Sequence, residues 1–265
     1  MTPGIVHIGP GAFHRAHQAA YVDAILPHDP RWGISAVALN STGVADALGP
    51  QDGLYTLALL GETVGHRVIG SMVELLTAGR RDAILSRIAA PTTRLVSTTV
   101  TEKGYHLDAG GALDMEHPAI IRELTGAEPS TLSGWLVAGL AARRAAGGGA
   151  ITLMACDNLA DNGRRFRRSV RDLAAARDPD LAAWIDDHVR FPSTMVDLDH
   201  PGDRRRAAPV GRCGHRPRRR MADPARGVHP VGDRGRFRHR PPPSTSPGCS
   251  SPTTCTGSRM RSCGC

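Results

Sequence analysis

The chain has 265 residues, 33 basic and 25 acidic side chains and a formal net charge of +8, and Lys103 is its single lysine. This length suffices for one large domain or two smaller ones with a buried core. A run of about 18 apolar residues, which a transmembrane helix requires, does not occur. The N-terminus shows no basic stretch followed by an apolar one, so we expect no signal peptide, no membrane association and a cytoplasmic location.

The charge is distributed unevenly, because the composition changes after Asp203. Residues 204–265 contain 15 arginines, two aspartates and nine prolines, with no Leu, Ile, Lys or Glu. Their net charge is +13, whereas residues 1–203 carry −5. A segment with so few apolar side chains cannot bury enough surface to offset its chain entropy. The sequence therefore predicts a folded domain over 1–200 and a disordered Arg/Pro-rich tail over 201–265.

Three interpretations of this tail are open. An arginine-rich segment can bind nucleic acid through phosphates, but Phe237 is the single aromatic residue of the tail, which gives no support for base stacking. Five cysteines could form metal or disulfide sites, although no C-x-x-C pair is present. We favour the third interpretation, translation of a GC-rich gene out of frame, which yields this composition. We therefore do not expect nucleic acid as a partner.

The first 200 residues alternate between β-rich and helical patterns. In chain order they predict a strand at 4–9, a helix at 14–26, a strand at 32–39, and a hairpin or two-strand insertion at 55–60 and 66–72. They then predict a helix at 81–89, a strand at 94–100, a helix at 131–146 ended by Gly147, a strand at 150–156, and helices at 159–176 and 181–189. Strands that alternate with helices predict an α/β fold, a Rossmann-like and mainly parallel sheet with flanking helices.

The first candidate site is Gly9-Pro10-Gly11-Ala12-Phe13-His14, between the first strand and the first helix. Glycines at such a turn let the backbone approach a pyrophosphate, and the helix N-terminus supplies amide donors. His14 occupies the position of the third glycine in G-x-G-x-x-G, so a tight turn without a ligand is the alternative. Asn40, at the end of the second strand, is neither the acid that favours NAD nor the base that favours NADP.

Two further features, the His14/His17 pair and Lys103, have a structural interpretation beside the functional one. His14 and His17 are three residues apart, but no third ligand is evident, so packing is the simpler interpretation and we expect no metal. Lys103 follows a β-rich run and could transfer a proton, but Glu102 beside it is also consistent with an ordinary ion pair. We favour a structural role for this lysine.

The second candidate site is C-D-N-L-A-D-N-G at 156–163, which follows a strand and opens a helix. Asp157 or Asn158 can cap that helix, and an amide at this place can also donate to a reacting carbonyl or alkoxide. Cys156 has no base placed beside it by the sequence and is expected to be a buried small residue. The extended segment F-P-S-T-M-V-D at 191–197 ends in an acid.

Five motifs together resemble the mannitol dehydrogenase family, the long-chain polyol dehydrogenases that include fructuronate and tagaturonate reductases. They are G-P-G-A-F-H-R-A-H-Q-A at 9–19, Q-D-G-L-Y-T at 51–56, T-V-T-E-K-G-Y at 99–105, and the motifs at 156–163 and 191–197. The resemblance implies metal-independent hydride transfer between a polyol such as mannitol and a ketose such as fructose, with NAD as cofactor and NADP not excluded. It implies a cofactor site made of Gly9, Gly11, Ala12, Phe13 and Val196. It also implies that Asn158 polarises the substrate oxygen and that Asp197 contacts the substrate.

The sequence departs from the family pattern after residue 197. The family's catalytic lysine lies in a C-terminal helical domain, whereas this chain has no lysine after Lys103. We therefore expect that domain to be missing, and a monomeric or aggregation-prone protein that binds cofactor weakly and is inactive. A hexuronate reductase is the alternative within the family, and a nucleic-acid-binding protein that uses the basic tail is the alternative outside it.

Overall fold

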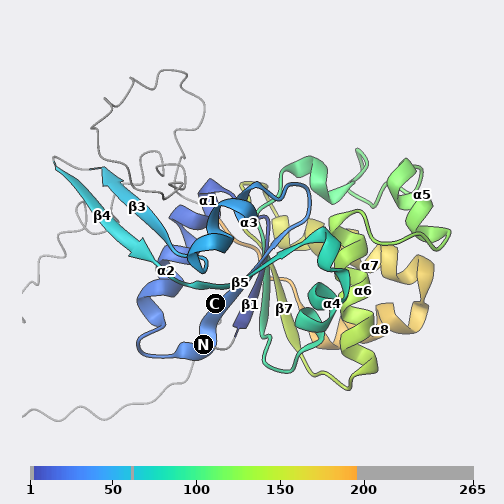
Figure 1. The fold of residues 1–265 in the computed structure, drawn as a ribbon. Helices are drawn as coiled ribbons and strands as arrows, with labels where there is room; N and C mark the ends of the chain where they lie inside the picture. The colour runs from blue at the N-terminus through green and yellow to red at the C-terminus, as the bar shows by residue number, and fades with distance from the viewer. Residues whose placement is uncertain (1–2, 61–62, 196–265) are drawn as a thin grey trace, which may run out of the picture. The chain divides into compact units, whose positions relative to one another are not determined.

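The structure is a computed structural model, which describes residues 3–60 and 63–195. A six-stranded parallel sheet forms its centre, in the order β5-β2-β1-β6-β7-β8 (Figure 1). Its strands are β1 (Pro3–Ile8), β2 (Gly33–Ala38), β5 (Met72–Thr77), β6 (Leu95–Thr98), β7 (Ile151–Ala155) and β8 (Val189–Arg190). Counted within this sheet alone, the order is the 3-2-1-4-5-6 of a doubly wound Rossmann fold, which confirms the predicted class.

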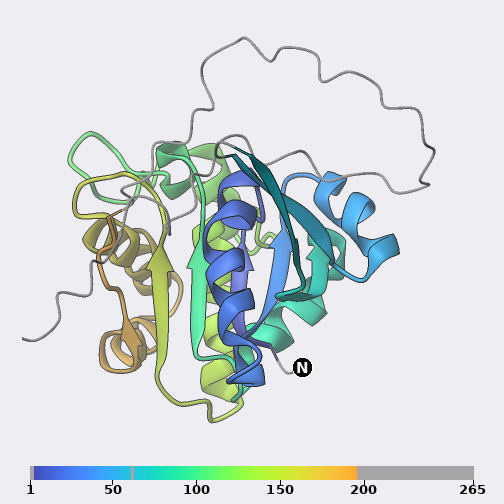
Figure 2. The same ribbon diagram turned by 90° about the vertical axis from the view of Figure 1, so that its left-hand side faces the viewer.

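Helices cover both faces of the sheet (Figures 1 and 2). One face carries α1 (Ala12–Ala16), α2 (Gln18–Ile25), α3 (Gly43–Leu48) and an antiparallel hairpin of β3 (Tyr55–Leu60) and β4 (Val64–Ile69). The other carries α4 (Arg81–Ala89), α6 (Leu132–Ala145), α7 (Asn162–Arg177) and α8 (Pro179–His188), with α5 (Pro118–Leu124) against α7. Two hydrophobic cores result, one on each face.

The central strands are buried on both sides, as their apolar runs predict. All residues of β1 and β2 are buried. Successive side chains alternate between the two cores, so Ile5 packs with α1 and α2, whereas Val6 packs on the opposite face. His7 is a polar exception in β1 and is fully buried.

Two predicted elements differ from the structure. The helix predicted over 14–26 is broken at His17, where φ is −116° and ψ is −92°, and so becomes α1 and α2. The run 66–72 is not a hairpin strand throughout, because β4 ends at Ile69 and β5 begins at Met72 beside β2. Ser71 lies at this break, accepting from Ile34 N–H (2.9 Å) and donating to Ala19 O (2.7 Å). Local periodicity indicated a strand but not which strand it pairs with.

The other predicted strands and helices are confirmed to within a few residues, and Gly147, at φ +67°, ends α6 as its sequence predicts. The sequence patterns missed α3, α5 and β8. No helix in the described ranges is both long and apolar enough to cross a membrane. The predicted tail, Val196 and Asp197 all lie outside the described residues.

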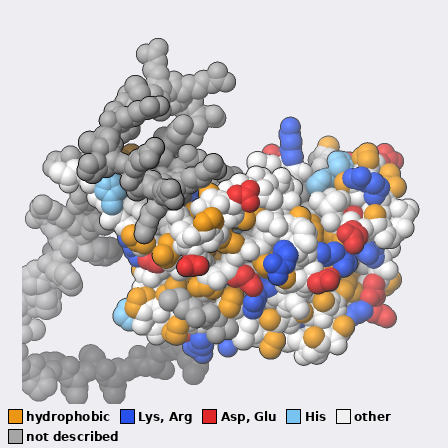
Figure 3. Space-filling model, viewed as in Figure 1, with side chains coloured by type: hydrophobic (Ala, Val, Ile, Leu, Met, Phe, Trp, Pro, Cys, Tyr) orange, Lys and Arg blue, Asp and Glu red, His pale blue; other side chains and the backbone are white. Residues whose placement is uncertain are grey.

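Charged side chains of both signs are interspersed with apolar ones on the face shown in Figure 3. Many arginines are paired with acids: Arg87 with Glu74 at 2.8 Å and Arg167 with Asp186 at 2.7 Å, for example. The described surface in this view therefore shows mixed charge rather than one continuous basic patch.

Candidate functional site

The turn that follows β1 lies where the strand order of the sheet reverses, between β1 and β6. In open α/β sheets this point is where ligands bind. Gly9 has φ +93°, and a Cβ there would stand 2.6 Å from Thr99 O. Its N–H donates to Val37 O at 3.0 Å. Both the positive φ and the contact with the chain after β6 therefore require glycine at this position.

Gly11 is a glycine for a different reason. It is the N-cap of α1 with an ordinary φ of −69°, and it accepts from Arg15 N–H at 3.1 Å. A Cβ at Gly11 would meet nothing closer than Gly9 O, at 3.9 Å. Backbone strain does not explain the glycine, but the space that its missing side chain leaves open suits a phosphate at a helix N-terminus. The turn thus fits the pyrophosphate of a dinucleotide.

The two residues after Gly11 differ in exposure. Ala12 is exposed and begins α1. Phe13 is half-buried, and its ring stacks on His17 with centroids 5.1 Å apart. Both follow the turn directly, where the resemblance implies cofactor contact.

His14, at the third-glycine position, stacks on His7 of β1. The ring centroids are 3.4 Å apart, the planes differ by 9°, and both side chains are fully buried. Burial lowers the pKa of His7 to about 3 and the pKa of His14 well below its usual value. Two neutral rings therefore form the contact between helix and strand that glycine provides in the standard fingerprint. His17 contacts Phe13 and Tyr21 instead.

The second candidate site lies at the same edge of the sheet. Asn158 is exposed in the loop after β7, and no hydrogen bond joins its side chain to the described part of the chain. β6 separates β1 from β7, so the spacing of neighbouring strands places the two strand ends roughly 10 Å apart. The Gly9–Phe13 turn and the Asn158 loop therefore lie near each other at the C-terminal edge of the sheet.

Helix α7 does not begin as predicted. Its N-cap is Asp161, which makes no side-chain cap, and its first residue is Asn162. The predicted caps, Asp157 and Asn158, lie further upstream, and Asp157 Oδ1 accepts from Leu159 N–H at 3.0 Å. The prediction that Asp157 or Asn158 caps this helix is therefore wrong, because the loop makes its own tight turn before the helix starts.

Tyr105, which the sequence pattern does not single out, supports the Asn158 loop from the protein interior. This fully buried residue donates its hydroxyl proton to Asp157 Oδ2. Burial, and then the Asp157 carboxylate, raise the pKa of Tyr105 well above its usual value, so the phenol remains a donor. Its ring packs edge to face against Phe166 of α7. The sequence placed Tyr105 after a strand but gave no sign of its partner.

Asn162 was also missed, and it fastens the segment 191–195 to this site. Its Oδ1 accepts from Thr194 N–H at 2.9 Å, and its Nδ2 donates to Thr194 Oγ1 at 3.0 Å. Thr194 Oγ1 donates in turn to Ala155 O, at the end of β7, at 2.5 Å. A Cβ on Gly163 would stand 2.6 Å from Phe191 O. The N-G pair therefore brings the F-P-S-T segment to the C-terminal end of β7.

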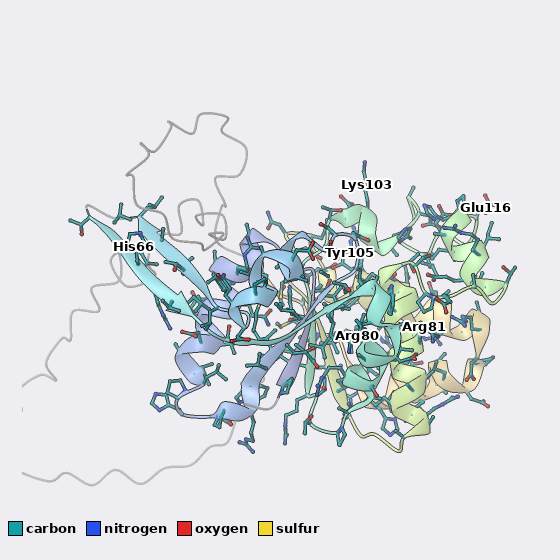
Figure 4. The ribbon with its side chains drawn as sticks, in the orientation of Figure 1. His66, Arg80, Arg81, Lys103, Tyr105 and Glu116 are labelled. Atoms are coloured by element: carbon teal, nitrogen blue, oxygen red, sulfur yellow. The ribbon has the colours of Figure 1, made fainter. Side chains whose placement is uncertain are left out.

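Two other candidates have no place in this arrangement. Lys103 is exposed on a short turn, points outward (Figure 4) and forms no ion pair with Glu102 or any other described acid. Cys156 is half-buried, and burial, together with Asp157, raises the pKa of its thiol to about 11. A protonated thiol is a poor nucleophile.

Comparisons with known proteins agree with this arrangement. Residues 3–208 match the mannitol dehydrogenase Rossmann domain. The chain is 43% identical to the polyol:NADP oxidoreductase of Gluconobacter oxydans over 213 residues, which are 76% of this chain and 43% of the relative. It is 46% identical to the D-mannonate oxidoreductase of Escherichia coli over 202 residues, 73% of this chain and 42% of the relative.

A solved structure, the ternary complex of Pseudomonas fluorescens mannitol 2-dehydrogenase with NAD and D-mannitol, is also similar. Its TM-score is 0.68 at 42% identity, over 72% of this chain and 41% of that one. The chain thus spans less than half the length of these relatives. The matched domain, the strand order and the glycine turn lead to one conclusion: the chain belongs to the mannitol dehydrogenase family.

Proposed function

We propose that the turn at 9–13 binds NAD and that the chain is the cofactor-binding part of an oxidoreductase that interconverts a polyol, such as mannitol, and a ketose, such as fructose. The observation that carries this proposal is the open N-cap at Gly11, placed at the reversal of strand order. Family membership and the similarity to an enzyme solved with NAD and D-mannitol support it.

The residues divide into two groups by what each does. Gly9, Gly11, Ala12 and Phe13 hold the cofactor, because the turn leaves room for its phosphates and the helix directs backbone amides toward them. A bound nicotinamide supplies the hydride acceptor or donor. Asn158 donates its amide N–H to the substrate oxygen, which stabilises negative charge there.

The segment at 191–195 continues directly into Val196 and Asp197. These two residues lie outside the described residues, and their roles beside the nicotinamide and the substrate are proposed from the family motif. Asn162 supports that assignment, since it holds Thr194 at the end of β7, in the same loop region as Asn158.

The choice between NAD and NADP depends on the end of β2. Asn40 carries no charge there. The residues that follow it bond locally: Ser41 Oγ accepts from Gly43 N–H at 3.2 Å, and Thr42 Oγ1 donates to Asp46 at 2.8 Å. No acid stands at the usual ribose position. We propose NAD as the cofactor, with NADP as the alternative that the name of the Gluconobacter relative supports.

A hexuronate is the alternative substrate. The D-mannonate oxidoreductase is as similar to this chain as the polyol relatives are, so identity does not separate a sugar acid from a polyol. The proposed roles of Asn158 and the glycine turn are the same for both, because the reacting carbon carries a hydroxyl or a carbonyl in either case.

Titration of the full chain with NADH and with NADPH, followed by nicotinamide fluorescence, tests the proposal. Saturable binding of NADH that mannitol or fructose does not abolish is the expected result. A chain that is folded by circular dichroism and binds neither nucleotide would refute the assignment of the turn.

A further inference from the structure

Three hydrogen-bond donors converge on the carbonyl oxygen of Gly9. Gly11 N–H donates to it at 2.7 Å, and Thr99 Oγ1 donates to it at 2.5 Å. His7 Nε2 lies 3.1 Å away. The first donor belongs to the turn itself, whereas the other two come from beneath it, from β1 and from the chain just after β6. The conformation of the turn thus depends on side chains that lie under it.

The proton positions around His7 follow from these contacts. A carbonyl only accepts, so the contact with Gly9 O places a proton on His7 Nε2. Thr99 uses its single proton on the same carbonyl, so it cannot also donate to the imidazole, from which it lies 3.1 Å away. Burial lowers the pKa of His7 to about 3. The ring is therefore neutral, with Nε2 as its donor and Nδ1 as its acceptor.

The other ring nitrogen completes the chain of bonds. Ser97 Oγ lies 2.8 Å from His7 Nδ1, and it donates to Gln18 Oε1 at 2.9 Å. A neutral His7 with its proton on Nε2 requires the Ser97 proton at Nδ1 instead. A half-turn of the Gln18 amide allows this, because the amide NH2 group then donates to Ser97 Oγ. The chain therefore runs from Gln18 in α2, through Ser97 in β6 and His7 in β1, to the carbonyl of Gly9.

His14 holds the imidazole of His7 in this orientation. It stacks on His7 from α1 with centroids 3.4 Å apart. Its own nitrogens are buried and have no hydrogen-bond partner among the described residues. Its contribution is thus the flat face of the ring, and the packed rings leave His7 no room to turn away from Gly9.

We propose that His7 is a positioning residue for the cofactor turn: its Nε2–H holds the Gly9 carbonyl and thereby sets the backbone on which nucleotide binding depends. The proposal rests on the proposed function of the turn. His7 does not touch the cofactor, since the imidazole is fully buried beneath the turn. It acts through Gly9 alone.

The test compares His7→Gln with His7→Met in the full chain. The two replacements have nearly the same shape, but only glutamine can donate to Gly9 O. We expect His7→Gln to bind NADH within about threefold of the wild type and His7→Met to bind about tenfold more weakly, the worth of one hydrogen bond. If His7 had only a structural role, NADH affinity would follow thermal stability. His7→Met would then be the better variant in both measurements, because burying methionine costs less than burying glutamine. His66→Gln, on the exposed β4 (Figure 4), is the control.

A second measurement keeps the proposal testable if His7→Met does not fold. Nitrogen-15 NMR of labelled histidines, assigned with the His7→Gln spectrum, reports the tautomer of His7 directly. We expect the Nε2–H form in the wild type and a weaker preference for it in Ser97→Ala, together with weaker NADH binding. An Nδ1–H tautomer in the wild type overturns the proposal.

The two proposals fail in different ways. A folded wild-type chain that binds neither NADH nor NADPH refutes the proposed function and the positioning role with it. A wild type that binds NADH, with His7→Met and His7→Gln equal to it in affinity, overturns the positioning role alone.

Discussion

Gly9 and Gly11 stand two residues apart in one turn, yet the described residues resist a side chain at Gly9 alone. At Gly9, φ is +93° and an added Cβ would stand 2.6 Å from Thr99 O. Gly11 is constrained by nothing within the described chain nearer than 3.9 Å. Substitutions at the two positions therefore separate stability from binding.

We expect Gly9→Ala to lower the free energy of unfolding by about 1–3 kcal/mol, through strain at positive φ and the clash with Thr99. Gly11→Asp should leave stability within about 0.5 kcal/mol and abolish NADH binding, because it puts a carboxylate where the phosphates lie. Urea unfolding and NADH titration measure the two effects. Gly79→Asp, at an open surface glycine, serves as the control, and equal NADH binding by Gly11→Asp and the wild type would contradict the site.

The buried histidines predict that stability falls in mild acid. The pKa of His7 is about 3 in the folded chain and 6.5 when exposed. Between these values the unfolded chain binds a proton at His7 that the folded chain does not. The contribution of His7 to stability is therefore constant above about pH 6.5 and declines as the pH falls toward 3. From His7 alone we expect stability to be about 2 kcal/mol lower at pH 5 than at pH 7.5, and His14 adds to this decline.

Urea titrations of the wild type and of His7→Gln at both pH values measure this decline. The variant should lose less stability between pH 7.5 and pH 5, by about the 2 kcal/mol assigned to His7. The exposed His66→Gln variant should behave as the wild type does. Identical pH dependence in all three proteins would show that His7 is not held neutral by burial.

At the scale of elements, the first residue of α7 connects the loop after β7 to the segment 191–195. Asn162, its first residue, is fully buried and bonds to the loop after β7 on one side and to Thr194 on the other. Asn158, four residues earlier, is the same residue type but is exposed. Asn162 thus holds neighbouring segments of the site together, whereas Asn158 is the residue proposed to act on the substrate.

We expect Asn162→Ala to lower the free energy of unfolding by about 2 kcal/mol or more, because it leaves Thr194 N–H and the loop carbonyls without their partner. Asn158→Ala should change stability by less than about 0.5 kcal/mol. Thermal and urea unfolding of the two matched variants give the comparison. A larger loss of stability in Asn158→Ala than in Asn162→Ala would reverse the assignment of the two asparagines.

At the scale of the whole molecule, the chain contains one side of the proposed chemistry. The sequence has no lysine after Lys103, and Lys103 itself is exposed and points outward. An oxidation of an alcohol needs a proton acceptor as well as a hydride acceptor, and a general base is worth a factor of about 10²–10⁴ in rate. Because Lys103 is not placed to act as that acceptor, we predict little or no mannitol oxidation by this chain on its own.

Fusing residues 1–197 to the part of Pseudomonas fluorescens mannitol 2-dehydrogenase that lies beyond the matched region should restore mannitol oxidation. NADH formation, followed at 340 nm, is the measurement, and the unfused chain is the reference. Asn158→Ala in the fusion should lower kcat about 10²–10³-fold if its amide stabilises the developing charge. Normal turnover of mannitol by the unfused chain would show that the part beyond the matched region is not needed for proton transfer.

The sequence by itself determined the fold class, the glycine turn and the family resemblance. Buried parallel strands are continuous apolar runs, and a turn such as Gly9–Gly11 needs glycines in fixed places, so both are visible in local sequence. The Cys156–Gly163 segment stood out for the same reason, because polar residues cluster directly after a buried strand.

Only the tertiary structure decided which residues support these segments. Tyr105 under Asp157, Asn162 against Thr194 and His7 beneath Gly9 are pairings between elements, and local periodicity carries no information about partners. For the same reason the pattern at 66–72 predicts a single strand, whereas the structure divides this run between β4 and β5. His14 seemed only an imperfect match to a fingerprint until the fold placed its ring on His7, where a stacked pair takes the place of the missing glycine.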